Sequence, residues 1–414
     1  MIRDSLHYPT VEHSLPDALT AISAQILPLA QEKVSLIHAL ARISAVPLLS
    51  SRPKPSYDQS TRDGFALSSH PLSNGDNKAV FKVIAEVAAG CRKEIFLQPG
   101  EAVRIMTGGM IPLGCVRVVP FEVCNDSGRK VTIPEFELTR RQRYIRFLGS
   151  DSKEGALLVP VGTRLLPDHL LMLAENGWFD LPVYRQPKVA VLCTGSELVE
   201  LGEAVQPGQK VSGNTILLSA LLQAHGVCCS RSITVADKAD VIVEQVRQLL
   251  DDEPDIIIST GGMGPGKFDL MEQVFARVGG TVLYNRLQVR PGKFTLFGTV
   301  GKTPFFGLPG PPPAVRILFH ELIVPALNRL QGCGNGSSKL IDAVLQSTLS
   351  LKQTGHFNLK GAIVRTVEGH LLARPAGKME PINAIMHLEG GRTAAKQGES
   401  VKVRLVEPLQ GLAV

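Results

Sequence analysis

The chain has 414 residues, 44% of them hydrophobic and 20% charged, and a formal net charge of +6 at pH 7. This composition excludes a disordered or fibrous protein, and the length exceeds what one hydrophobic core supports, so we expect three or four domains. The sequence shows neither an apolar run long enough to span a bilayer nor an N-terminal signal core. We therefore expect a cytoplasmic protein that does not bind a membrane.

The cysteines and the basic residues exclude further classes of protein. The seven cysteines form no Cys-x-x-Cys pair, so the sequence predicts neither disulfides nor a structural zinc site. The densest basic run lies at 140–146; it is typical of a solvated face, with a phosphate-bearing ligand as the alternative. Aromatic residues that could stack on bases are scarce there, so we expect no nucleic-acid partner.

The first predicted helix begins after Ser14. Its features are a hydroxyl cap at Ser14, Pro16 in the first turn, Asp17 at the positive end and apolar residues at helical spacing up to Ile26. A second short helical segment is predicted at 34–41. Prolines at 47, 53 and 55 then mark a boundary.

A small β domain is predicted next. From 80 to 133 the apolar segments are short, β-branched and separated by turns. Asp63 lies in a polar turn just before this stretch, and Thr107 lies on a glycine turn within it. After Asp151, a helix predicted at 167–176 indicates that the chain returns to its first domain.

The pattern from residue 188 onward is typical of a doubly wound α/β domain, because buried strands alternate with helices. Strands are predicted at 188–193, 227–235, 255–260 and 281–284, and helices at 216–224, from the cap Asp237 to 250, from 268 onward and at 314–330. Ligands of such domains bind at the carboxyl ends of the strands. Three loops lie there, at 194–198, 261–269 and 307–312.

The second of these loops is rich in glycine. Gly261, Gly262, Gly264 and Gly266 separate a buried strand from a helix start, which is suited to holding an anion on backbone N–H groups. A tight turn without a ligand is the alternative. Asp269, at the end of the loop, favours a metal ion or a proton transfer beside a phosphate.

Further charged residues favour phosphate chemistry. Glu197 lies in the first loop, and Arg290 and Lys293 flank a tight Pro-Gly turn that suits a phosphate or oxyanion. The sequence contains no Gly-x-Ser-x-Gly elbow and no Cys/His nucleophilic arrangement. The residues alone therefore indicate magnesium-assisted chemistry on a phosphate ester or anhydride, but they do not identify the substrate.

The C-terminal part follows a glycine- and serine-rich linker at 331–338. Its alternating, turn-rich pattern predicts a small β-barrel to which we assign no chemistry. The predicted organisation is thus a discontinuous linking domain of helices and mixed structure (1–50 and 144–185), an inserted β domain (51–143), an α/β domain (186–330) and a β-barrel (331–414).

Six motifs occur in a fixed order: DQSTRDGFA at 58–66, IMTG at 105–108, CTGSEL at 193–198, STGG at 259–262 with Asp269 following, RPGK at 290–293 and GLPG at 307–310. In this combination the chain resembles the molybdopterin molybdenumtransferase family (MoeA in bacteria, the E domain of gephyrin in animals) over nearly its whole length.

This resemblance implies that the α/β domain binds molybdopterin. It also implies insertion of molybdate into adenylylated molybdopterin and Mg²⁺-dependent release of AMP, by an elongated homodimer in which the β domain closes over the partner's α/β domain. A molybdopterin adenylyltransferase and recipient apo-molybdoenzymes are the implied partners.

The resemblance also implies roles for individual residues. Asp63, Asp269 and Glu197 would be catalytic, and Asp269 and Glu197 would help hold the metal ion; a helix-start carboxylate is the alternative for Glu197. Substrate-binding positions would be Thr107, Asp151, Gly261, Gly262, Gly264, Lys267, Arg290, Lys293, Pro309 and Gly310.

Several positions depart from the family pattern. The family usually has Asn where Pro311 stands and Ser where Ala314 stands, so two hydrogen-bond donors are missing from a helix start that should face the oxyanion. It also has an acid where Lys267 stands and Ser where Gly264 stands. These changes keep two alternatives open: an insertase specific for tungstate or for one recipient enzyme, and a non-catalytic molybdopterin-binding scaffold.

Overall fold

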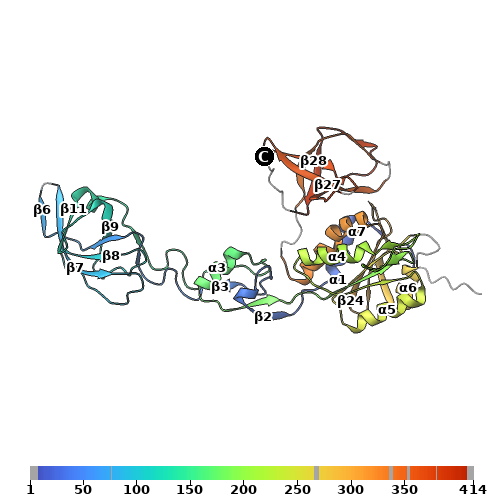
Figure 1. Cartoon of the computed structure of the whole chain (residues 1–414), viewed down its shortest axis with the longest axis horizontal. Coiled ribbons are helices and arrows are strands. Elements are labelled where there is room, and N and C mark those ends of the chain that lie inside the picture. The colour runs from blue at the N-terminus through green and yellow to red at the C-terminus, as the bar shows by residue number, and fades with distance from the viewer. Residues whose placement is uncertain are drawn as a thin grey trace, which may run out of the picture.

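The computed structural model describes residues 8–75, 77–264, 270–334, 339–351, 355–378 and 380–407. The chain has a multidomain fold of α/β and β segments (Figure 1). A β-sheet segment forms one end of an elongated molecule, and an α/β segment and a barrel form the other. Within the described ranges, no helix has both the length and the apolar character needed to cross a bilayer.

The middle of the molecule is a stem made from two parts of the chain. Strand β2 (Gln31–Ser35) pairs with β14 (Asp180–Tyr184), and β3 (Leu48–Leu49) pairs with β13 (Leu157–Val159), both antiparallel. Helix α3 (Pro167–Glu175) covers them, as predicted. The helix predicted at 34–41 is wrong at its start, because Val34 and Ser35 belong to β2 and only η1 (Leu36–His38) makes a short 3-10 turn.

The β-sheet segment contains β5 (Gly64–Leu67), β6 (Ser73–Gly75), β7 (Lys78–Val87), β8 (Glu101–Ile105), β9 (Arg117–Pro120), β10 (Asn125–Asp126) and β11 (Lys130–Pro134). Its strand order is β10-β11-β7-β8-β5-β9, and β6 pairs with β7. Residues from alternate positions of these strands form its core, with Phe65 and Phe81 almost fully buried. The β-rich stretch predicted at 80–133 is therefore present.

The α/β segment is a six-stranded sheet in the order β18-β15-β19-β24-β23-β20. Its strands are β15 (Val189–Thr194), β18 (Cys229–Val235), β19 (Ile256–Thr260), β20 (Gly280–Tyr284), β23 (Leu296–Val300) and β24 (Thr303–Leu308). The first four in this order are parallel, and β23 pairs antiparallel with β24 and β20.

Helices cover both faces of this sheet, which makes the segment doubly wound. Helix α1 (Leu15–Gln25), capped by Ser14 as predicted, packs with α4 (Gly213–Ala224) in one apolar cluster. Helices α5 (Ala239–Asp251) and α6 (Met271–Arg277) form a second cluster on the opposite face. The predicted cap of α5 is wrong, because Lys238 is the cap residue and Asp237 bonds elsewhere.

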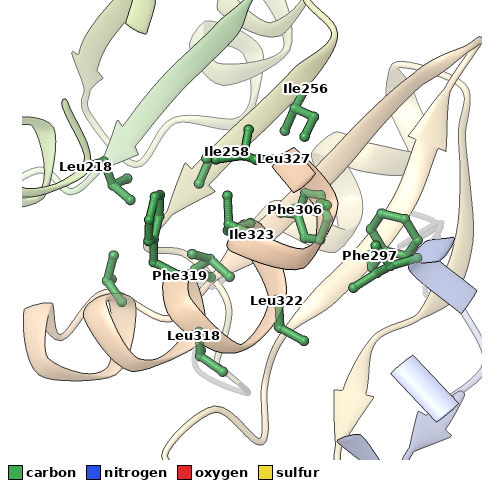
Figure 2. Packing of buried hydrophobic residues seen from close by; sticks show 14 of the residues in the cluster. Leu218, Ile256, Ile258, Phe297, Phe306, Leu318, Phe319, Leu322, Ile323 and Leu327 are labelled. Atoms are coloured by element: carbon green, nitrogen blue, oxygen red, sulfur yellow. The ribbon is translucent and has the colours of Figure 1, made fainter. Parts of the chain in front are cut away.

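The long helical run near the end of this segment contains a wider turn. It consists of α7 (Pro312–Leu318), the π-helix η3 (Phe319–Ile323) and α8 (Val324–Leu330), whereas one regular helix over 314–330 was predicted. Pro325 lacks an N–H group and its ring crowds the carbonyl of Glu321, which a wider turn relieves. Figure 2 shows Phe319, Ile323 and Leu327 of this run beside Ile258 and Phe306 of the sheet.

The barrel is closed by five strands: β25 (Ile341–Leu345), β27 (Phe357–Val367), β28 (His370–Pro375), β29 (Ala384–Leu388) and β31 (Ser400–Leu405). The order β27-β28-β25-β31-β29 returns to β27, as predicted for this part of the chain. A short strand from the preceding segment, β22 (Val289–Arg290), pairs with β27 from outside the barrel.

Smaller elements complete the fold. The two-stranded ladders are β1 (Glu12–His13) with β21 (Arg286–Leu287), β4 (Gln59–Ser60) with β12 (Ile145–Arg146), β16 (Leu198–Val199) with β17 (Lys210–Val211), and β26 (Leu349–Ser350) with β30 (Ala394–Ala395). A 3-10 turn η2 (Phe121–Val123) and a short helix α2 (Glu135–Thr139) flank β10 and β11.

Candidate active site

A cavity of about 700 Å³ lies at the carboxyl ends of β15, β19 and β24 and at the start of α4. This is the edge at which ligands of open α/β sheets bind. Residues from all three predicted loops line it. They are Thr194, Gly195, Glu197, Leu198, Lys210, Val211, Ser212, Gly213, Asn214, Asp237, Gly261, Gly262, Met263, Gly264, Phe294, Pro309, Gly310, Pro311 and Pro312.

The glycine loop fits closely against the end of β15. Gly261 has φ +95°, and a Cβ there would lie 2.3 Å from the carbonyl oxygen of Thr194. Its N–H donates to the carbonyl of Leu308 on the neighbouring strand β24 at 3.1 Å. Only glycine can occupy this position, because any side chain would overlap the adjacent backbone. The loop is therefore joined to both flanking strands where they end.

Two carboxylates line the cavity. Glu197 accepts an ion pair from Lys210, with 3.0 Å between Oε1 and Nζ. The hydrogen bond from Lys210 holds the pKa of Glu197 below its usual value. Asp237 accepts the Ser196 N–H at 3.1 Å, and the Ser196 hydroxyl bonds back to the Asp237 N–H at 3.0 Å. This reciprocal pair fixes Asp237 at the cavity instead of at the start of α5.

Asn214 connects the loops from the side of α4. Its amide nitrogen donates to Thr260 Oγ1 at 3.2 Å and to the Gly310 carbonyl at 2.8 Å. The carbonyl can only accept, so the amide orientation is determined. The Oδ1 of Asn214 and the hydroxyl of Thr194 are buried at the cavity wall, and neither has a hydrogen-bond partner among the residues that the structure describes. Buried polar atoms without partners are rare and indicate a functional surface.

The start of α7 forms an apolar wall of the cavity. Pro311 is its cap residue, and the two residues that follow are also proline, so none of these three positions carries an N–H group. A helix start normally offers free N–H groups to an anion. Here the first N–H groups, those of Ala314 and Val315, are bonded to the carbonyl of Pro311 at 2.9 and 3.1 Å. This end of the cavity therefore suits an uncharged part of a ligand.

The turn carrying Arg290 and Lys293 lies next to the cavity without lining it. The following residue, Phe294, does line it, and the Lys293 ammonium is 6.0 Å from the Phe294 ring. Both cations are exposed, and no carboxylate of the described residues pairs with either. They are thus available to a ligand that reaches past Phe294.

Asp63 and Thr107 lie in the β-sheet segment at the opposite end of the molecule (Figure 1). Asp63 Oδ1 accepts the Thr107 N–H at 2.6 Å and the Thr107 hydroxyl at 2.8 Å. These two bonds hold the pKa of Asp63 below its ordinary value. Asp151 lies elsewhere again, beside the stem, where Arg146 Nε donates to its Oδ1 at 2.9 Å.

The structure therefore brings together only part of the predicted set. Glu197, the three glycines, Pro309 and Gly310 meet at one cavity, whereas Asp63, Thr107 and Asp151 lie away from it. Lys267 and Asp269 lie outside the described residues. Sequence reasoning missed Lys210, Asn214 and Asp237 as members of the site. A carboxylate directly after a strand of such a sheet, as at Asp237, is a signal that could have found one of them.

The carboxylates at the cavity fit a magnesium ion that is held mainly by a substrate. The described part of the chain contains no group of three or more His, Cys, Asp or Glu residues placed to hold a metal by themselves. Mg²⁺ commonly takes one or two carboxylates together with substrate phosphates and water. Glu197 and Asp237 offer such carboxylates at the cavity.

Comparisons with known proteins agree with this geometry. Residues 13–177 match the family described as MoeA N-terminal region (domain I and II), and residues 190–329 match a probable molybdopterin binding domain. The chain is 32% identical to the molybdopterin molybdenumtransferase of a Nostoc species over 310 residues, covering 74% of this chain and 70% of that protein.

Similarity extends over nearly the whole chain in other relatives. The molybdopterin molybdenumtransferase of Staphylococcus aureus is 30% identical over 384 residues, covering 90% of this chain and 91% of that protein. The crystal structure of a molybdopterin biosynthesis MoeA protein from Pyrococcus horikoshii is 25% identical, with a TM-score of 0.80 and coverage of 96% of this chain and 99% of that one. The chain belongs to the molybdopterin molybdenumtransferase (MoeA) family.

Proposed function

We propose that this protein inserts molybdate into adenylylated molybdopterin during molybdenum cofactor biosynthesis, with Mg²⁺-dependent release of AMP. The observation that carries the proposal is the cavity of about 700 Å³, where a glycine loop, two carboxylates and unpartnered polar atoms meet at the carboxyl end of a sheet. Membership of the family supplies the substrate.

Each part of the cavity has a role in this proposal. Backbone N–H groups at Gly262 and Gly264 hold the phosphate of molybdopterin, and Gly261, whose own N–H is bonded to Leu308, allows the loop to pass close to Thr194. Asn214 fixes the positions of the loops, and the proline wall of α7 contacts the uncharged part of the substrate. Arg290 and Lys293 neutralise the oxyanion, and Lys267 adds a cation beside the phosphate.

Glu197 and Asp269 hold the magnesium ion in this proposal, and Asp237 adds a third carboxylate. A bound Mg²⁺ would offset the negative charge on the phosphate groups whose bridging P–O bond is cleaved. The ion pair with Lys210 lowers the pKa of Glu197 and holds its carboxylate in position at the cavity.

A homodimer completes the site. Asp63 and Thr107 lie at the other end of the elongated chain from the cavity, so one copy does not join them to it (Figure 1). In a dimer, the β-sheet segment of one copy covers the cavity of the other and brings Asp63 to the substrate, with Asp151 beside the entrance. The stem exposes apolar side chains suited to such an interface, including Ile37 at 82% and Phe179 at 78% exposure.

The proposal also places the protein in the cytoplasm, between two partners. A molybdopterin adenylyltransferase supplies the adenylylated substrate, and apo-molybdoenzymes accept the product. Neither nucleic acid nor a membrane is part of this proposal.

One observation favours a second candidate function. The start of α7 offers no donor from Pro311, Pro312 or Pro313, and loss of oxyanion donors can cost several kcal/mol of binding. A scaffold that holds and passes on molybdopterin without catalysis would not need those donors. The catalytic form of this alternative is an insertase for tungstate or for one dedicated recipient enzyme.

The deciding experiment uses purified protein with adenylylated molybdopterin, Mg²⁺ and either molybdate or tungstate. The proposal expects AMP release that depends on molybdate, together with reconstitution of an apo-molybdoenzyme. Asp269→Ala should abolish release while the circular dichroism spectrum is unchanged. Preference for tungstate would support the dedicated insertase. Tight binding of the adenylylated substrate without AMP release would leave only the scaffold.

A further inference from the structure

The C-terminal barrel holds part of the candidate site in place. Strand β22, which ends at Arg290, pairs in parallel with β27 of the barrel, with Val289 opposite Phe357 and Arg290 opposite Asn358. The Phe357 N–H donates to the carbonyl of Gln288 at 2.9 Å. The backbone next to the cationic turn is therefore paired with the barrel sheet along one side.

The other side of the same turn is fixed to the α/β segment. Gly292 has φ +117°, and a Cβ there would lie 2.8 Å from Cδ2 of Leu318, the last residue of α7. The buried Thr295 hydroxyl donates to the Gly292 carbonyl at 2.7 Å, and the Leu287 N–H donates to the Lys293 carbonyl at 2.8 Å. The turn is thus held between the barrel and α7.

A buried carboxylate joins these same two bodies. Glu321 lies one turn after Leu318, in the π-helix η3, and is 1% exposed. Its Oε1 accepts from two barrel strands: it is 2.8 Å from His387 Nε2 on β29 and 3.0 Å from Arg404 Nε on β31. Both bonds end on one oxygen, so a single carboxylate links two barrel strands to the helix, beside the apolar contacts that Leu359 and Ile385 of the barrel make in the same cluster.

We propose that Glu321, with His387 and Arg404, is a positioning residue that holds the barrel so that β22 presents Arg290 and Lys293 to the oxyanion. This inference rests on the proposed function for the identity of the oxyanion. It assigns a role to the barrel, for which the sequence indicated none. It also gives a reason for a buried carboxylate in a helical run that packs many apolar residues, among them Phe319, Leu322 and Ile323 (Figure 2).

The test compares Glu321→Gln with Glu399→Gln in the full-length protein. Glu399 forms a bidentate pair with Arg392 at 2.6 and 2.8 Å within the barrel, and it serves as the control because its carboxylate bonds to barrel residues and, within the described part of the chain, to neither η3 nor β22. Hydrogen exchange followed by mass spectrometry measures the exchange rates of the Leu287 and Phe357 amides, because the hydrogen bonds of these two amides hold the turn. Exchange there should accelerate in Glu321→Gln and stay unchanged in Glu399→Gln.

Steady-state kinetics give the second readout. A misplaced cationic turn should raise the KM for molybdate roughly tenfold, since displacement of a positioning group by about 1 Å has effects of this size or larger. The KM for adenylylated molybdopterin should change less than about twofold, because its phosphate is held by the glycine loop. If Glu321→Gln does not fold, His387→Ala removes only one of the two bonds and is tested in the same way.

The outcomes separate this inference from the proposed function. Wild-type protein without oxyanion-dependent AMP release would end the proposed function, while the exchange measurement would still decide whether Glu321 holds the turn. Unchanged exchange in Glu321→Gln, or an equal rise of both KM values, would overturn the inference and leave the proposed function standing. Equal effects of Glu321→Gln and Glu399→Gln would overturn it as well.

Discussion

Two regions carry carboxylates assigned to the site, and they differ in what surrounds them. At the cavity, Glu197 and Asp237 lie among loops from several parallel strands, next to a space large enough for a substrate. In the β-sheet segment, Asp63 is exposed and its carboxylate accepts two hydrogen bonds from Thr107. The first region offers a cavity but lacks Asp63, and the second presents Asp63 at its surface. Under the proposed function each would be half of a site, which is the arrangement a symmetric dimer can complete.

The sharpest test of this comparison combines two inactive variants. Asp63→Asn and Glu197→Gln should each reduce AMP release by at least about 100-fold, because each removes a charge at the reacting phosphate. Copies carrying different tags can be co-expressed and the mixed dimer purified. If the site is shared, the mixed dimer has one intact site and should recover about half of the activity of the unmodified dimer. A mixed dimer as inactive as its parents would show that each copy works alone.

The next largest effect is expected at the glycine loop. Gly261→Ala places a Cβ 2.3 Å from the Thr194 carbonyl oxygen at φ +95°, so we expect a loss of roughly 3 kcal/mol in unfolding free energy. Substrate binding should be lost with it. Urea unfolding followed by helical ellipticity measures the stability.

Gly202→Ala is the matched control for that variant. Gly202 has a nearly identical φ of +96°, but a Cβ there would meet no atom within 4 Å. The control should cost only about 1 kcal/mol and leave binding intact. Equal losses in the two variants would mean that backbone strain, and not contact with Thr194, sets the requirement for glycine.

A pH-dependent effect from a buried histidine is expected in the α/β segment. Burial, with a smaller contribution from the neighbouring His225, lowers the pKa of His320 from 6.5 to about 4. Between these values the unfolded chain binds a proton that the folded chain does not, so stability should fall as the pH drops from about 6.5 to 4. The loss should be about 2 kcal/mol, and it should be absent above pH 7.

His320→Gln tests this assignment, because the variant has no imidazole to protonate. Urea unfolding at pH 7 and pH 4.5 should show a smaller difference for the variant than for the wild type. Glu321, Arg316 and Arg404 also face this imidazole, so part of the pH dependence should remain. An unchanged difference would assign the effect to other groups.

The smallest predicted effect concerns the proline wall. Pro311→Asn restores a side-chain donor at the cap of α7, where no side chain caps the helix now. We expect the unfolding free energy to rise by about 1 kcal/mol and the affinity for molybdate to increase up to roughly tenfold. Isothermal titration with molybdate and with inorganic phosphate measures the affinity. Unchanged affinity for both anions would place the oxyanion away from this wall.

Much of the fold could be predicted because its signals are local. The run of isoleucines at 256–258 indicated a strand buried on both faces, and Ser14 with Asp17 indicated the start of a helix; both are present. Val34 was misassigned because pairing with β14, more than 140 residues later, determines its conformation. Asp237 was misassigned because Ser196, on another loop, competes for its carboxylate. Local pattern carries no information on such distant partners.

The candidate site was predictable to a smaller extent for the same reason. The glycines and Glu197 follow strands directly, so their common edge could be inferred from order alone. Asn214 and Lys210 follow no such rule, since they reach the cavity from the start of α4 and from β17. The link through Glu321 joins residues of the α/β segment to strands more than 60 residues later.

The stem through the middle of the molecule has a mechanical consequence. The chain passes along it twice, and the two passes are bonded to each other by β2 with β14 and β3 with β13. A single connecting segment would let the two ends rotate about one bond, whereas a paired connection resists torsion along its length. The distance and the orientation of Asp63 relative to the α/β segment of the same copy are therefore fixed by the stem of that copy. In a symmetric dimer, the Asp63 carboxylate of one copy would therefore always enter the partner's cavity to the same distance. Strong contacts between the β-sheet segment and the partner would not be needed for this.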